Sequence, residues 1–541
     1  MNERRRLGVQ DALWLEMDRP SNLMVVDSLV WTATPIDWAC LRAVVRERLW
    51  DRYPAFRSVV VRGEDGAWYW EDRSDSDFEA HIEQVVLPRP GDERSLQAFI
   101  GSQRTVPLDR TKPLWRMFLV DGYHGGSAVF SRSHHAIADG IRMVQLAMSL
   151  FDATPGGGAI LAPPVHLHAA TAHSPGQPTW HRLAAGASDG ARQLTRVTSD
   201  VADRVTRVAA DPIGRSAHQL SEIGRSASHA VATTAITSLA LARMAATNPV
   251  GAAHSAATKV AAAVESTSSA VRAGMPLLPP GGGPLVDVFS AAPGDVDFAR
   301  KLLVGTRNDA TIWTGSVGTH KAVAWSAPLP LAKVKAVAKA HRVTVNDVLV
   351  TCVAETLRAY LDGHGASCGS VNWMIPVNLK PLDTTLPEDL GNSFAIVQLE
   401  LPTNIADPVR VLDVVRHRMG RIKQGHEAAL AFRVQEVISG LSKTVYQASV
   451  DLLANRAIGV LTNVPGPPMP VYLAGEKVDG MVGWAPLSGN QPMSFTIYSY
   501  DKKVFVGIAC DAGLVPDHEQ IVDGFAEAFG RLARATHGGL K

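Results

Sequence analysis

The sequence predicts an α/β protein with two domains and a helical insertion between them. The chain has 541 residues. This length exceeds what a single hydrophobic core usually supports. Short apolar runs alternate with helix-like apolar spacing in residues 1–163 and again in residues 285–541, a pattern typical of α/β domains. Residues 164–284 between them are instead rich in Ala, Ser, Thr and Arg.

The first domain closes just after its most chemically distinctive segment, Ser133–Gly140, which reads Ser-His-His-Ala-Ile-Ala-Asp-Gly. The preceding run, Ser127–Arg132, has the pattern of a short strand. Apolar residues recur downstream at helical spacing, at Ile141, Val144, Met148 and Phe151. We therefore expect the two histidines where a strand ends and a helix follows.

The adjacent histidines, His134 and His135, predict a general-base site. Neighbouring residues of an extended chain point to opposite faces, so both rings enter one pocket, or bind one metal, only if the backbone turns between them. One ring is then architectural. Neutral imidazole, with an ordinary pKa of about 6.5, accepts a proton near neutral pH and contributes roughly 100- to 10,000-fold in rate. The alternative is a buried, hydrogen-bonded strand end without chemistry.

Asp139 and Gly140 complete the segment. Asp139 has two candidate roles: it orients an imidazole, or it pairs with an arginine elsewhere and locks the turn. Gly140 is expected to supply a backbone conformation, or a close packing distance, that a side chain forbids.

The insertion predicts helices followed by a linker. Four valines lie three or four residues apart on one helical stripe: Val197, Val201, Val205 and Val208. Pro212 and Pro249 should divide the helices, and Pro276–Pro284 reads as a linker. Docking of these helices on a lipid surface is one interpretation. The scarcity of Trp, Phe and Leu favours a hairpin packed on the protein body, or partial disorder.

Composition excludes several classes of partner. The 53 basic and 52 acidic residues leave a formal charge of +1, so nothing favours nucleic acid or a strongly anionic partner. The four cysteines lack Cys-x-x-Cys spacing, which disfavours a zinc site or a disulfide framework, and no metal is expected. No secretory signal follows Arg4–Arg6, and no apolar run approaches about 20 residues. We expect a cytoplasmic protein, soluble or peripheral to the inner membrane or lipid droplets.

The histidine segment resembles the His-His-x-x-x-Asp-Gly motif of the acyltransferase superfamily that includes chloramphenicol acetyltransferase, the condensation domains of peptide synthetases and the bacterial wax ester synthase/diacylglycerol acyltransferases. The last family is the most similar, because further elements of it follow in the correct order. These are Gln10–Trp14 with Pro20–Met24, Pro107–Asp109 with Lys112–Trp115, Thr344–Leu349, Ile375–Leu379, Gly391–Asn392 and Thr462–Pro467. Six ordered elements are more specific than one heptapeptide.

This resemblance implies two chloramphenicol acetyltransferase-like subdomains, with mixed sheets flanked by helices, around a central tunnel. It implies acyl transfer from acyl-CoA to diacylglycerol, giving triacylglycerol, and to long-chain alcohols, giving wax esters. His135 is implied as the general base, with His134 and Asp139 holding the loop. The thioester is already activated, so acyl-CoA serves as co-substrate and no cofactor or covalent intermediate is required. The absence of a Gly-x-Ser-x-Gly segment disfavours a Ser-His-Asp hydrolase.

The other matching segments supply supporting residues. Gly140, Asn346 and Asp347 are implied to support the motif, although Asn346 or Asp347 equally suits a cap of the following helix. Candidate substrate-binding donors are Asn378, Asn392 and Ser393, for which a turn or strand-end hydrogen bond is the alternative. Trp115 is expected in the core. The Pro465–Pro467 turn is expected to fix a crossover between the domains.

Two features depart from the family pattern, and two other functions compete. The insertion is long for the family. The strand motif reads Pro376–Lys380 where a Ser followed by an Arg-containing sequence is expected, which weakens the transfer of a contact to Asn378. A condensation-type or polyketide-ester acyltransferase would take its acyl group from a carrier protein. A catalytically silent lipid-binding or lipid-droplet protein would keep the fold without turnover, against which the intact histidines and Asp139 argue.

Overall fold

The computed structural model describes residues 4–73, 76–158, 310–378, 386–387, 390–392, 394–424, 450–451 and 453–538. Met1–Thr171, Arg307–Gln424 and Ala454–Lys541 form one compact unit. The predicted insertion, residues 164–284, with its valine stripe and linker, lies outside the described residues.

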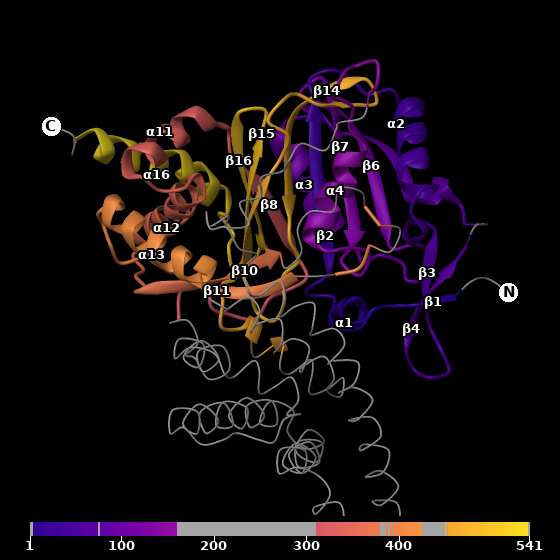
Figure 1. Ribbon diagram of the computed structural model, residues 1–541, viewed down its shortest axis with the longest axis horizontal. Coiled ribbons are helices and arrows are strands. Elements are labelled where there is room, and N and C mark those ends of the chain that lie inside the picture. The colour runs from indigo at the N-terminus through magenta and orange to yellow at the C-terminus, as the bar shows by residue number, and fades with distance from the viewer. Residues whose placement is uncertain are drawn as a thin grey trace, which may run out of the picture. The chain divides into compact units, whose positions relative to one another are not determined.

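A six-stranded sheet carries the histidine segment. Its order is β13-β14-β2-β7-β6-β5. The strands are β2 (Val25–Thr32), β5 (Ile82–Val86), β6 (Trp115–Tyr123), β7 (Gly126–His134), β13 (Tyr472–Leu473) and β14 (Glu476–Trp484). All neighbours pair antiparallel except β5 and β6, which are parallel. The sheet is therefore mixed, and β13 and β14 come from the C-terminal part of the chain (Figure 1).

Helices and a smaller sheet surround these strands. The helices are α1 (Val9–Met17), α2 (Trp38–Val45), α3 (Glu93–Arg104) and α4 (Gly140–Ser149), with short turns of helix at η1 (Arg46–Trp50), η2 (Pro54–Phe56) and η3 (Phe78–His81). The small sheet has the order β1-β4-β3, from β1 (Arg4–Arg6), β3 (Ser58–Arg62) and β4 (Trp68–Asp72). Trp115 is 1 % exposed in the core of this half, which confirms its predicted place.

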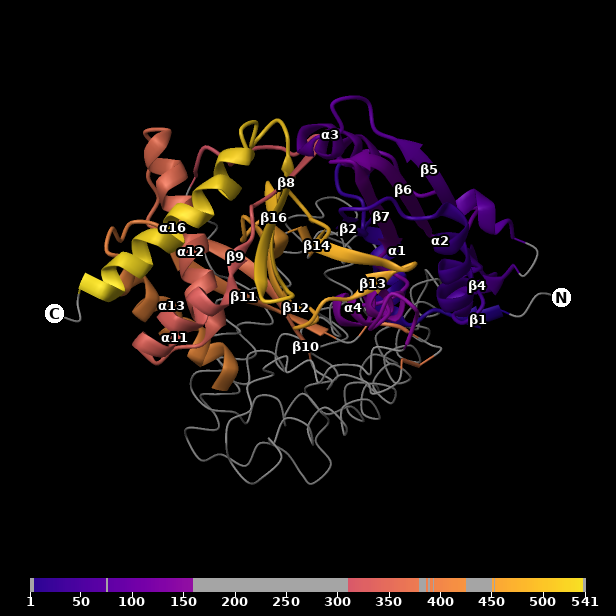
Figure 2. The ribbon, with the colours of Figure 1, turned by 90° about the horizontal axis from the view of Figure 1, so that it is seen from above.

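The second half is a seven-stranded mixed sheet, in which β11-β10-β12-β15-β16-β8 form the path and β9 pairs with β16. Its strands are β8 (Lys321–Trp325), β9 (Leu329–Pro330), β10 (Ser370–Asn378), β11 (Phe394–Pro402), β12 (Gly459–Pro465), β15 (Met493–Tyr500) and β16 (Lys503–Asp511). The helices are α11 (Leu331–His341), α12 (Val345–Gly363), α13 (Pro408–Gln424) and α16 (Glu519–Gly538), which gather on one side of the sheet (Figures 1 and 2).

The two large sheets share a hydrophobic cluster. It combines Phe118, Phe130 and Leu29 of the first sheet with Trp325 and Ala509 of the second. The Pro465–Pro467 turn marks the predicted crossover, because the chain leaves the seven-stranded sheet at the end of β12 and next pairs as β13 and β14 in the six-stranded sheet. The predicted class, α/β with mixed sheets flanked by helices, is confirmed.

Candidate active site

Strand β7 delivers the histidines to the junction of the two sheets. Ala128 and Phe130 face the cluster that joins the sheets, whereas Val129 packs in the core of the first half. This alternation is that of a strand buried on both faces. The strand ends at His134 and α4 begins at Gly140. The predicted strand, turn and helix are confirmed, except that the helix ends at Ser149, before Phe151.

His134 is bonded into the turn. Its ring is 1 % exposed, and Nδ1 accepts a hydrogen bond of 3.1 Å from the backbone N–H of Ala136. Neutral His134 therefore carries its proton on Nε2, which lies 3.8 Å from the Asp18 carboxylate. Burial raises the pKa of Asp18, but bonds from His134, Met24 and Arg110 outweigh it and leave that pKa lowered.

His135 has different neighbours, as expected for adjacent residues at a strand end. Its backbone N–H donates to the Met24 carbonyl at 2.8 Å. Its ring stacks on Trp14 of α1 with centroids 3.9 Å apart and planes 22° apart, and Phe394 at the start of β11 lies 5.7 Å away. The ring is thus held between residues from distant parts of the sequence, with only 6 % of the residue exposed.

Burial also sets the charge of His135. Desolvation lowers its pKa to about 4, assisted by the nearby His134 and opposed by its own backbone and by Asn392. A ring with this pKa is neutral at physiological pH, and its lone pair is available to accept a proton. Burial thus gives the residue the protonation state that a general base requires.

A reaction in which His135 is the base should therefore keep its rate in mildly acidic solution. If His135 must be unprotonated, kcat/KM should stay level down to about pH 5 and fall near pH 4, instead of near the ordinary value of about 6.5. Because the folded-state pKa lies below the unfolded one, the free energy of unfolding decreases as the pH falls from about 6.5 to about 4. A pH-rate profile checks the prediction, with circular dichroism confirming folded protein at each pH. An acid limb near pH 6.5 in folded protein would contradict it.

Asp139 fixes the turn by capping the helix that follows. Its side chain accepts from the backbone N–H of Arg142 at 2.9 Å, as the N-cap of α4. Its own backbone N–H donates to the Gly391 carbonyl at 3.3 Å, and Arg142 Nη1 reaches the same carbonyl at 3.3 Å. The histidine turn is therefore tied to the segment that precedes β11.

The expectation for Gly140 is wrong. A Cβ built on this residue has no heavy atom of the described chain within 4 Å, and its φ lies outside the left-handed region. Among the described residues, neither a close approach nor the backbone conformation requires glycine there. Gly391 is the glycine at the site that does adopt a left-handed conformation, with φ of +50°.

The other predicted residues divide into those near the histidines and those elsewhere. Asn392 is near: its Nδ2 donates to the His135 carbonyl at 3.0 Å. Asn378 ends β10 and pairs in register with Phe394, which places its backbone beside the site, although its side chain lies outside the described residues. Ser393 also lies outside them.

Asn346 and Asp347 have structural partners at the start of α12. Thr344 and Asp347 form a reciprocal capping box, with bonds of 3.1 and 2.9 Å. Asn346 Oδ1 accepts from Asn463 Nδ2 at 2.7 Å. Asp347 therefore takes part in capping the helix, but the cap residue is Thr344, and Asn346 bonds to Asn463 instead.

Sequence reasoning gave no role to two residues that contact the site. Trp14 and Asp11 lie three positions apart, on one face of α1. Trp14 stacks on His135, and Asp11 accepts from Asn392 at 2.7 Å. The available signal was a large aromatic residue and an acidic residue at helical spacing, within a segment that resembles the family.

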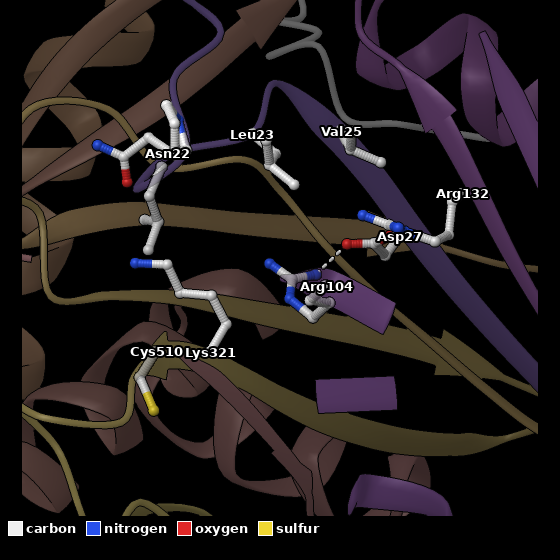
Figure 3. A pocket seen from close by; sticks show the side chains of 10 residues that line it. Asn22, Leu23, Val25, Asp27, Arg104, Arg132, Lys321 and Cys510 are labelled. Atoms are coloured by element: carbon white, nitrogen blue, oxygen red, sulfur yellow. Dashed lines mark hydrogen bonds and ion pairs between the residues drawn. The ribbon is translucent and has the colours of Figure 1, made fainter. Parts of the chain in front are cut away.

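A small polar cavity lies beside β2, the strand that pairs with β7 (Figure 3). It encloses about 20 Å³, room for about one water molecule. Its lining includes Val25, the register partner of His134, together with Asp27, Arg104, Arg132 and Lys321. The predicted tunnel through His135 stays a prediction. Among the described helices, none is long and apolar enough to span a bilayer.

Comparisons with known proteins agree with this geometry. Residues 7–248 match the wax ester synthase/diacylglycerol acyltransferase catalytic domain, and residues 390–533 match the C-terminal domain of the same family. A relative from Mycobacterium tuberculosis strain H37Rv, assigned by its name to the diacylglycerol O-acyltransferases, is 24 % identical over 98 % of both chains. The O-acyltransferase WSD of Acinetobacter baylyi is 23 % identical over 82 % of this chain and 78 % of its own length.

Solved structures show the same fold. The wax ester synthase/diacylglycerol acyltransferase from Marinobacter aquaeolei VT8 superposes with a TM-score of 0.60 at 17 % identity, covering 98 % of this chain and 100 % of the other. The first condensation domain of the calcium-dependent antibiotic synthetase reaches 0.50 at 13 % identity, with coverage of 99 % and 96 %. The chain is therefore an acyltransferase that belongs to the wax ester synthase/diacylglycerol acyltransferase family.

Proposed function

We propose that the protein transfers a fatty acyl group from acyl-CoA to the free hydroxyl of diacylglycerol, which gives triacylglycerol, and that long-chain alcohols are second acceptors, which give wax esters. The observation that carries the proposal is the buried, neutral His135 at the junction of the two sheets. Family membership and the named relatives support the class of substrates.

In the proposed reaction, Nε2 of His135 takes the proton of the acceptor hydroxyl as its oxygen attacks the thioester carbonyl. The C–O bond forms, the C–S bond breaks, and the proton passes from the imidazolium to the leaving thiolate. Because the thioester is already activated, the chain needs to position both substrates, accept the proton and stabilise the oxyanion. We propose that no resident cofactor takes part, so a chelator should leave the rate unchanged.

A substrate panel tests the proposal. Purified protein is given labelled acyl-CoA with diacylglycerol, a long-chain alcohol, or no acceptor, and the products are identified by mass. We expect triacylglycerol as the main product and wax ester as the second. A parallel arm offers the same acyl group on a carrier protein. Transfer from the carrier alone would favour the condensation-type alternative, and binding of diacylglycerol without product would favour the silent lipid-binding protein.

We also propose that the protein works at a lipid surface, peripheral to the inner membrane or to lipid droplets. Diacylglycerol is nearly insoluble in water, so the acceptor has to be taken from a bilayer or a droplet. Flotation with vesicles containing diacylglycerol checks this. Protein that stays at the bottom of the gradient, yet makes triacylglycerol from detergent-dispersed diacylglycerol, would contradict surface binding while leaving acyl transfer intact.

A further inference from the structure

Asn392 joins three distant parts of the chain at the candidate base. Its Nδ2 donates to Oδ1 of Asp11 at 2.7 Å and to the backbone carbonyl of His135 at 3.0 Å. Asp11 belongs to α1, His135 follows β7, and Asn392 precedes β11. Asp11 and His135 are both buried. The amide is therefore held from two sides.

These contacts determine which way the amide faces. A carboxylate and a carbonyl can only accept hydrogen bonds, so the NH2 group of Asn392 has to face Asp11 and the His135 carbonyl. Flipping the amide would set its oxygen against two other acceptors. The carboxylate of Asp11 thus fixes the position of Oδ1 as well as that of Nδ2.

Two polar atoms at this place have no hydrogen-bond partner among the described residues: Oδ1 of Asn392 and Nδ1 of His135. Both are buried and they are complementary, because an amide oxygen accepts and a protonated ring nitrogen donates. Leaving a buried polar atom without a hydrogen bond costs free energy. Two complementary unpaired atoms on contacting residues therefore indicate a hydrogen bond that forms between them during function.

We propose that Asn392, oriented by Asp11, is a positioning residue for His135: Oδ1 accepts the Nδ1–H of the ring and leaves the Nε2 lone pair for the acceptor hydroxyl. The inference rests on the proposed role of His135 as base. When the ring takes up the proton, this bond becomes charge-assisted, and the Asp11 carboxylate faces the new charge across the amide. The resulting chain is carboxylate, amide, imidazole.

The surroundings of the His135 ring make this hydrogen bond to its protonated form necessary. Trp14 covers one face of the imidazole, and Phe394 lies close by. His134 disfavours a second positive charge, while Asp18 faces His134 and is bonded to Arg110. Asp139 and Arg142 hold the next turn of the chain. Asn392 is the side chain in this set that opposes the loss of the ring's basicity.

Two variants test the inference. Asn392→Ala removes the bond to the imidazolium, and kcat should fall by about 10- to 150-fold, the range expected for a hydrogen bond to a charged group, with KM for acyl-CoA little changed. The exchange Asp11→Asn with Asn392→Asp keeps an amide–carboxylate pair between these positions and sets the carboxylate beside the ring, with loss of the bond to the His135 carbonyl. The acid limb of the pH-rate profile should then move up by about 1–3 pH units.

Gln84→Ala provides the matched control. Gln84 donates to the Asp121 carboxylate at 2.7 Å on an exposed sheet edge, a bond of the same kind away from the histidines, and its loss should leave kcat and the pH profile unchanged. The exchange variant keeps the shapes of both side chains and the bond between them and loses only the bond to the His135 carbonyl, so it carries the test if Asn392→Ala does not fold. An unmoved acid limb in the folded exchange variant would overturn the inference. A fully active His135→Ala variant would instead overturn the proposed function itself.

Discussion

Replacing His135 with alanine should lower kcat/KM for acyl transfer to diacylglycerol by about 100- to 10,000-fold. The substrates and the rest of the site are unchanged, but the variant lacks the imidazole that would take the hydroxyl proton at the position that Trp14 and Met24 define. Radiolabelled acyl-CoA gives enough sensitivity to measure rates across this range.

Two controls separate lost chemistry from lost structure. His320→Ala removes an exposed histidine and should match the wild type in both rate and melting temperature. Free imidazole should restore part of the rate to His135→Ala, because it can enter the space left by the ring and supply the missing lone pair. A folded His135→Ala variant with wild-type activity would show that this ring is not the base.

Asp27→Asn should destabilise the folded chain by about 3–5 kcal/mol. Asp27 is 2 % exposed and pairs with Arg104 and with Arg132, the latter at 3.1 Å, inside the junction of the sheets (Figure 3). Removing its charge leaves two buried guanidinium groups without a carboxylate. Arg104 shows how costly this environment is, since burial lowers its pKa even with Asp27 present to oppose the shift.

The urea midpoint, followed by tryptophan fluorescence, measures this loss. Glu83→Gln breaks the exposed pair between Glu83 and Arg116 and should cost less than about 1 kcal/mol. Adding Arg104→Met to Asp27→Asn should recover part of the stability, because it removes one of the stranded charges. Equal midpoints for Asp27→Asn and Glu83→Gln would mean that the buried network contributes little.

Sequence periodicity predicted the parts of the site that lie within one continuous stretch. The strand that ends at His134, the turn and the helix after Gly140 are encoded locally by alternation, turn residues and helical spacing. The separate surroundings of the two histidines followed from the geometry of an extended chain. The burial of Trp115 followed from its size and type.

The remaining parts depend on contacts that no local pattern encodes. The contacts of Asp11 with Asn392 and of Trp14 with His135 join positions more than one hundred residues apart. The burial of Arg132 was also unpredictable, because a charged residue at a strand end usually faces solvent, and only the opposing Asp27 on β2 makes this position tolerable. For Gly140 the sequence predicted a steric need for glycine, and the described residues show none.

The position of β14 has a consequence for biosynthesis. β14 covers one edge of β2, whose other edge pairs with the histidine strand. While the ribosome is still making the chain, that edge of β2 lacks its native partner strand until residues 476–484 have emerged. The nascent N-terminal half thus carries an open strand edge through most of its synthesis, the kind of surface on which aggregation begins. Truncation before β14 should accordingly give insoluble protein rather than a smaller active enzyme.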